Sequence, residues 1–176
     1  MSDFRFSPIK SEAELRKAIE YTHIACFQLC QLALGRYLPV AGNIGIFCHD
    51  DDEFIFLTAL REKLTDRNDN WNQKYFRLHE SITIPARGDL PETTYTYLYI
   101  RRPDPKSPQI GDVDFVIDSE EHRRLQSLAE LGERMNGIDL LYRPDLDMIR
   151  LSRPDIDALP YLTTKTMAEN VAAALE

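Results

Sequence analysis

The stretch Ile46–Phe54, IFCHDDDEF, is an apolar run that stops at a cluster of carboxylates. The apolar and partly β-branched residues from Asn43 onward favour a buried strand. Asp50 and Glu53 stand three residues apart, the spacing at which an aspartate caps a helix and a glutamate supports its first turn. The stretch therefore predicts a strand that ends where a helix begins, rather than a metal centre or a catalytic cluster.

The same pattern recurs later in the chain at a fixed offset of 68 residues. Both copies read as an apolar strand, an aspartate cap, a glutamate three residues on, and leucines at helical spacing. A looser pairing matches Arg102-Pro-Asp104 with Arg153-Pro-Asp155. We interpret the chain as one folding unit present twice. The matched pairs are Phe47 with Phe115, Asp50 with Asp118, Glu53 with Glu121, Leu57 with Leu125, and Leu60 with Leu128.

These patterns predict an α+β fold of tandem βαββ(β) modules that form a curved mixed sheet, preceded by a long N-terminal helix. The modules span about 43–104 and 111–162 within a duplicated domain at 39–163. Residues 1–38 form an N-terminal helical extension, and the alanine-rich residues 164–176 are expected to form a C-terminal helix.

The N-terminal helix begins at a capping box, Ser11 to Glu14, and reaches about Leu34, where Gly35 supplies a C-terminal cap. Apolar residues surround almost the whole circumference of Ile24–Leu34, so this half must be covered on more than one side. It either packs across a sheet or forms a subunit contact. We therefore expect a homodimer.

Composition limits the partners and the location. The 176 residues carry a net charge of −8 with dispersed basic residues, which opposes binding to nucleic acid. The sequence shows neither a secretory signal nor an apolar run long enough for a membrane span. Three cysteines without a spacing pattern fit a reducing compartment. We expect a cytoplasmic protein with no nucleic-acid or membrane partner.

Two segments carry a likeness to a known family. "VDFVIDSEEHRRLQSLAEL" (113–131) and "MIRLSRPDIDALPYL" (148–162) resemble the strand-to-helix opening and the closing hairpin of the vicinal oxygen chelate superfamily, which includes glyoxalases, dioxygenases and bleomycin-resistance proteins. The likeness covers roughly 43–162 and implies the curved duplicated sheet. A ferredoxin-like α+β fold is the alternative.

The resemblance also implies where a metal would bind. Family metalloenzymes hold their metal on the first and last strands of each module, positions that fall near Asn43, Gly111 or Asp112, and Pro160. Only Asp112 offers a suitable ligand, so the resemblance implies that the usual metal site is missing, and no cofactor is expected.

A possible small-molecule pocket follows from strand alternation. In Thr94–Arg101, tyrosines occupy one side of the predicted strand and Thr96, Leu98 and Ile100 the other. On a curved sheet the tyrosine side could stack against a ligand, although tyrosines also suit a core or a half-exposed surface. The pocket candidates are Tyr95, Tyr97, Tyr99, Arg77, His79 and Asp114.

Three other sets of residues have the chemistry of a metal or phosphate site. Asp112 and Asp114 place two carboxylates on one side of a strand, which can bind Mg²⁺ or simply face solvent or a cavity. If a metal is present, its ligands are Asp112, His49 and His79. The set His23, Cys26 and Cys30 shares one helical face, but an apolar helix favours core packing for it. His79-Glu-Ser81 lacks the second such motif that a phosphoesterase needs.

Three functions therefore remain open from the sequence. The first is a small-molecule-binding or accessory protein without the usual family metal. The second is a metal-dependent enzyme of lyase or dioxygenase type from the same superfamily. The third is an acidic protein-interaction or inhibitory module.

Overall fold

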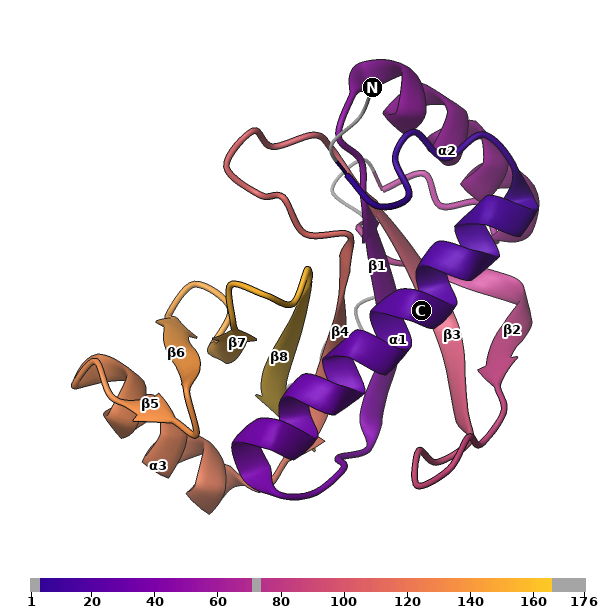
Figure 1. Cartoon of the computed structure of the whole chain (residues 1–176). Helices are drawn as coiled ribbons and strands as arrows, with labels where there is room; N and C mark the ends of the chain where they lie inside the picture. The colour runs from indigo at the N-terminus through magenta and orange to yellow at the C-terminus, as the bar shows by residue number, and fades with distance from the viewer. Residues whose placement is uncertain (1–3, 71–73, 166–176) are drawn as a thin grey trace.

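The structure is a computed structural model that describes residues 4–70 and 74–165 (Figure 1). Its order is αβαβββαββββ, and the expected C-terminal helix lies outside the described residues except for its first positions. The elements are α1 (Glu12–Leu34), β1 (Val40–Phe47), α2 (Asp51–Leu64), β2 (Phe76–Ile84), β3 (Thr93–Arg101), β4 (Gly111–Ile117), α3 (Ser119–Glu130), β5 (Arg134–Met135), β6 (Ile138–Arg143), β7 (Met148–Ser152) and β8 (Ala158–Thr164).

The strands form one curved, open, eight-stranded sheet in the order β2-β3-β1-β4-β8-β7-β6-β5. Strand β1 runs parallel to β3 and antiparallel to β4, and β4 runs parallel to β8, so the sheet is mixed. The two halves meet at the antiparallel β1–β4 pair. The α+β fold with a long N-terminal helix and a mixed sheet, predicted from the sequence, is confirmed.

The helices contribute to a single hydrophobic core with one face of the sheet. Ile44 of β1, Leu98 of β3 and Val113 of β4 pair across the sheet and lie in this core. Helix α1 crosses the sheet in front of β1 and β4 (Figure 1). The alternate residues of the same strands, including Gly45, Tyr99 and Asp112, point to the opposite side, which we call the open face.

Both predicted helix caps are present. The Asp50 carboxylate accepts a hydrogen bond from the Glu53 backbone N–H at 2.8 Å, and Asp118 accepts one from Glu121 at the same distance. Each aspartate lies between a strand and the helix that follows it. The carboxylate-rich stretch at residue 50 therefore begins a helix, as its spacing predicted.

Alanine at either cap should destabilise the protein by about 1 kcal/mol, because one N–H in the first turn loses its acceptor. Asp50→Ala and Asp118→Ala test the two caps, and urea unfolding measures the loss. Asp52→Ala and Glu120→Ala are controls in the same helical turns, since they only weaken the interaction with the helix dipole. Equal losses in cap and control variants would contradict the capping role.

The duplication is less regular than its offset suggested. Phe47 lies on the open face with Leu159 and Tyr161, whereas Phe115 lies in the main core. Ile46, which faces the core, lies four residues before the cap Asp50, whereas Ile117, which also faces the core, lies one residue before the cap Asp118, so the two strands are out of phase relative to their caps. The Arg-Pro-Asp pairing is wrong as well, because β3 pairs parallel with β1 while β7 pairs antiparallel with β8.

Helix α1 is covered by its own chain. Phe27 packs edge-on against Phe115, with ring centroids 4.9 Å apart. His23 shares a hydrogen bond of 2.8 Å with the Tyr95 hydroxyl, and burial lowers the pKa of His23 to about 4. Cys26 and Cys30 are fully buried beside them, as expected for core residues. The apolar half thus packs across the sheet, and the homodimer stays a prediction.

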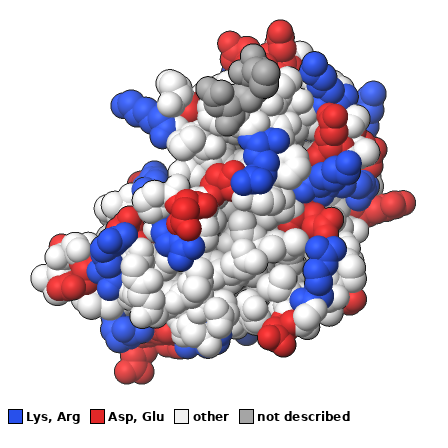
Figure 2. Space-filling view, viewed as in Figure 1, with Lys and Arg blue, Asp and Glu red and all other residues white. Residues whose placement is uncertain are grey.

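Charged side chains of both signs mix on the surface that Figure 2 shows, without a broad basic patch.

Within residues 4–70 and 74–165, none of the helices combines the length and the apolar character that crossing a membrane requires.

Candidate functional site

A cavity of about 540 Å³ opens on the open face of the sheet. Its lining comes from β3, β4 and β8, from the segment before β2, from the loop after β3, and from β6, β7 and the turn between them. Its lining residues are Lys74, Tyr75, Tyr99, Arg101, Asp104, Lys106, Ser107, Gln109, Asp112, Asp114, Arg143, Leu146, Met148, Arg150, Leu159 and Tyr161.

The Asp112 carboxyl fits into a notch that Gly45 leaves in β1. Gly45 and Asp112 are register partners, and a Cβ at residue 45 would lie 2.1 Å from Asp112 Oδ1. Tyr99 pairs with Gly45 from the other side, and its Cδ1 would lie 3.2 Å from the same Cβ. A glycine inside a strand often marks such a close approach. Gly45 therefore allows a carboxyl group to lie flat against the sheet.

Asp112 and its neighbour Asp114 are unusual acids. They are 9% and 5% exposed, and Asp112 Oδ1 has no hydrogen-bond partner among the described residues. Burial raises the pKa of Asp112 well above its usual range, and Asp114 adds to this rise, while Arg101 and nearby backbone amides oppose it. Burial also raises the pKa of Asp114 to about 6, although Asn43 opposes this by donating a hydrogen bond of 3.0 Å to Asp114 Oδ2.

Basic side chains outnumber acidic ones around the cavity, five to three. Arg101 is held by Asp104 at 2.9 Å and lies over the Phe47 ring, and Arg143 pairs with Asp145. Arg150 differs from both, since its buried Nε has no hydrogen-bond partner in the part of the chain that is described. A buried donor without an acceptor is costly, so Arg150 is suited to an anion that arrives from solution.

Aromatic rings form part of the wall. Tyr75 and Tyr99 lie with their ring centroids 5.5 Å apart. Tyr161 is 8% exposed and lies beside Asp114 in the sheet register. Burial raises the pKa of all three phenols, so they stay neutral hydrogen-bonding groups near neutral pH. The cavity thus combines buried acids, neutral phenols and cations.

The structure brings together three of the residues singled out from the sequence, namely Tyr99, Asp112 and Asp114. Tyr95 lies instead in the core, fully buried against His23. The predicted alternation fails because the β2–β3 register shifts between Arg77 and Ile82, which turns Tyr95 to the same side as Leu98. Tyr97 accepts a hydrogen bond from the exposed Arg77 at 3.2 Å, and neither residue lines the cavity.

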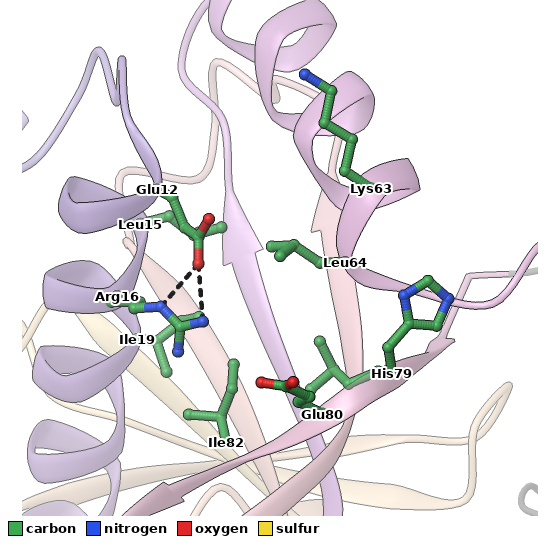
Figure 3. A pocket seen from close by; sticks show the side chains of 10 residues that line it. Glu12, Leu15, Arg16, Ile19, Lys63, Leu64, His79, Glu80 and Ile82 are labelled. Carbon is green, nitrogen blue, oxygen red and sulfur yellow. Dashed lines mark hydrogen bonds and ion pairs between the residues drawn. The ribbon is translucent and has the colours of Figure 1, made fainter.

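His79 lies in a different and smaller cavity, of about 280 Å³, between α1, α2 and β2 (Figure 3). Its Nε2 is 3.2 Å from an Asp66 carboxylate oxygen, and both side chains are exposed. In the same cavity Arg16 donates two hydrogen bonds to Glu12 (Figure 3). These charges are already paired at the surface, which makes this cavity a weaker candidate for ligand chemistry.

Two further cavities lie near α2. The larger, of about 740 Å³, includes Arg61, whose guanidinium lies 3.7 Å from the centroid of the Phe76 ring. The other, of about 490 Å³, lies beside the first turn of α2. Neither of these two cavities contains a pair of buried carboxyl groups. The open-face cavity is therefore the better candidate, although it is smaller than the cavity that includes Arg61.

The three metal-ligand candidates have separate surroundings. His49 stacks on Phe4 and its Nε2 lies 3.0 Å from the Gln109 carbonyl oxygen, whereas His79 pairs with Asp66 and Asp112 lies in its notch. Over residues 4–70 and 74–165, no group of three or more His, Cys, Asp or Glu side chains is arranged to hold a metal ion.

Sequence reasoning missed Gly45 and Arg150, and it considered Asn43 only as a position that matches a family metal ligand. Gly45 lies in the apolar stretch that had been assigned only a structural role, where a glycine within a strand was a usable signal. Arg150 could not be found in this way, because its place depends on the order β4-β8-β7 in the sheet.

Comparisons with known proteins give a fold but no function. No family model and no curated protein matches the sequence. A solved structure titled "Structural Genomics, Protein EC4020" matches with a TM-score of 0.59 and 15% identity, over 98% of both chains.

Two structures of Streptomyces coelicolor methylmalonyl-CoA epimerase in complex with 2-nitronate-propionyl-CoA give TM-scores of 0.32 and 0.31 at 16% and 14% identity. They cover 72% of this chain and 98% of their own, and a likeness this weak carries no argument about function. The chain therefore shares the fold of the first structure along nearly its whole length, and the vicinal oxygen chelate resemblance stays a prediction.

Proposed function

We propose that the chain binds a small anionic molecule in the cavity on the open face. The observation that carries this proposal is Arg150 Nε, a buried donor that has no hydrogen-bond partner among the described residues and that shares one cavity with the buried carboxyl group of Asp112. Buried polar groups are nearly always hydrogen-bonded in folded proteins. An exception that lines a cavity supports a site arranged for a ligand.

The negative charge of the proposed ligand follows from the residues that line the cavity. Five basic residues surround three acids, and Asp104 is already engaged by Arg101. The raised pKa of Asp112 favours its neutral form, which leaves an excess of positive charge in the cavity. A carboxylate or phosphate group would meet Arg150, while Tyr75, Tyr99 and Tyr161 offer aromatic surface to the rest of the molecule.

Arg150→Gln should weaken binding of small anions about 10-fold to 100-fold, since a charge-assisted hydrogen bond is lost. The probes are butyrate, 2-oxobutyrate and inorganic phosphate, titrated into the intact protein and followed by amide chemical shifts in NMR. Arg16→Gln is the matched control, because Arg16 lines the cavity of Figure 3 and not the open-face cavity.

We expect at least one probe to change the amide chemical shifts of β4, β7 and β8 in the wild type. Arg150→Gln should weaken this binding, and Arg16→Gln should leave it unchanged. Absence of binding by all three probes, or equal weakening by the Arg16 control, would show that the cavity is not an anion site.

A further inference from the structure

The two buried acids in the cavity cannot both be charged at neutral pH at low cost. Asp112 and Asp114 are alternate residues of β4, and both point to the open face. Two adjacent carboxylates in a buried site repel each other, so one of them keeps a proton. Asn43 donates a hydrogen bond to Asp114, which favours the charged form of Asp114. The shared proton therefore resides mainly on Asp112.

The titratable and charged groups that face Asp112 and Asp114 are consistent with a proton on Asp112. Arg101 and Tyr99 come from β3, Tyr161 from β8 and Arg150 from β7. Tyr75 contributes from the segment before β2, Arg143 from β6, and the buried Cys26 lies on the α1 side. Of these, the arginines favour a charged Asp112, but Arg101 and Arg143 are already bound to Asp104 and Asp145.

The distance across the site limits the length of the ligand. Asp114 pairs with Tyr161, and Tyr161 pairs with Arg150, so the three lie in one row across β4, β8 and β7. Neighbouring strands are spaced so that the Cα atoms of Asp114 and Arg150 lie about 10 Å apart. Asp112 lies two residues from Asp114 along β4, so its Cα atom is about 12 Å from that of Arg150. The side chains of Asp112 and Arg150 both line the cavity. A molecule that touches both of them is therefore only a few carbon atoms long.

We infer, on the basis of the proposed function, that the ligand is a short oxo- or hydroxycarboxylic acid. Its carboxylate binds Arg150, and its uncharged carbonyl or hydroxyl oxygen accepts a hydrogen bond from the protonated Asp112. Oδ1 of Asp112 is buried against Gly45, so Oδ2 is the oxygen that donates. An ammonium group at the same place would meet a neutral donor and the excess positive charge, so amino acids are disfavoured.

The test compares 2-oxobutyrate with butyrate, which differ only in the oxygen at the second carbon. At about pH 7 the wild-type protein should bind 2-oxobutyrate about tenfold more tightly, the value of one well-formed hydrogen bond. Asp112→Asn keeps a donor in the same place, so it should keep the preference. Asp112→Ala should bind both acids with nearly equal affinity. Isothermal titration calorimetry measures the six affinities, two acids for each of the three proteins.

The pH dependence gives a second readout. Over a pH range that crosses the raised pKa of Asp112, the carboxyl group loses its proton as the pH rises, and the preference of the wild type for 2-oxobutyrate should fall. Asparagine does not titrate, so the preference of Asp112→Asn should stay constant over that range. A preference that grows with pH, or one that Asp112→Asn abolishes, would overturn the inference.

The two proposals fail in different ways. If both acids bind equally in the wild type and Arg150→Gln weakens both, the cavity is an anion site and only the inferred ligand class is wrong. If neither acid binds, the proposed function is wrong and the inference with it. Circular dichroism of each variant establishes that it is folded, and Asp112→Asn, which keeps the size of the side chain, provides the readout if Asp112→Ala does not fold.

Discussion

Replacing Gly45 with alanine should abolish detectable binding of 2-oxobutyrate and destabilise the protein by about 1–3 kcal/mol, the usual cost of adding a methyl group to a packed interior. The added Cβ would lie 2.1 Å from Asp112 Oδ1 and 3.2 Å from Tyr99 Cδ1. Because both contacts are too close, the Asp112 carboxyl must leave its notch and enter the cavity. We therefore expect the affinity for 2-oxobutyrate and the free energy of unfolding to fall together. Calorimetric titration measures the first and urea unfolding the second.

A double-mutant cycle separates this contact from a general effect on β1. In the Asp112→Ala background the carboxyl is missing, so Gly45→Ala should cost much less than in the wild type. Residues in direct contact typically show coupling free energies of about 0.5–3 kcal/mol. If the cost of Gly45→Ala were the same in both backgrounds, the strain would come from Tyr99 or from the backbone, and the notch would not serve Asp112.

Asp112→Asn should stabilise the protein by about 1–3 kcal/mol at about pH 8, because asparagine, unlike aspartate, cannot place a negative charge in the interior. The direction of the pKa shifts predicts how the stability of the wild type changes with pH. Burial raises the pKa of Asp114 to about 6 and that of Asp112 well above its usual range. The folded state therefore binds more protons than the unfolded state above about pH 4, and stability falls as the pH rises.

Thermal unfolding from about pH 4 to about pH 9 checks this expectation. The wild type should lose stability through the titration of Asp114 and continue to lose it as Asp112 titrates, while Asp112→Asn should show a flatter profile. Asp89→Asn, at an exposed loop position, is the control and should follow the wild-type curve. A wild-type profile that rises over this range would mean that both carboxyl groups are satisfied as charged groups in the folded state.

The parts of the fold that depend on neighbouring residues were readable from the sequence. Asp50 and Asp118 cap helices because the bonds they make reach only three residues along the chain. Likewise, Asp112 and Asp114 were placed on one side of β4 because alternation in a regular strand needs no other information. Their burial was not predicted, since it depends on Gly45 of a neighbouring strand.

The parts that depend on strand pairing were not readable. Tyr95 was assigned to the tyrosine side of β3, but the irregular β2–β3 register turns it into the core. Arg150 joins the site only because β7 lies two strands from β4 in the sheet, an order that no local pattern contains. His49 and His79, attractive as single residues, are held in unrelated contacts. The pairing of strands that are distant in the sequence thus determines which of the candidate residues lie in the same cavity.

The most direct measurement is a crystal structure of the protein with 2-oxobutyrate bound. The account predicts electron density in the open-face cavity, with the carboxylate on the guanidinium of Arg150 and the oxo group within hydrogen-bond distance of Asp112 Oδ2. Density confined to another cavity, or a bound molecule that contacts neither Arg150 nor Asp112, would contradict it.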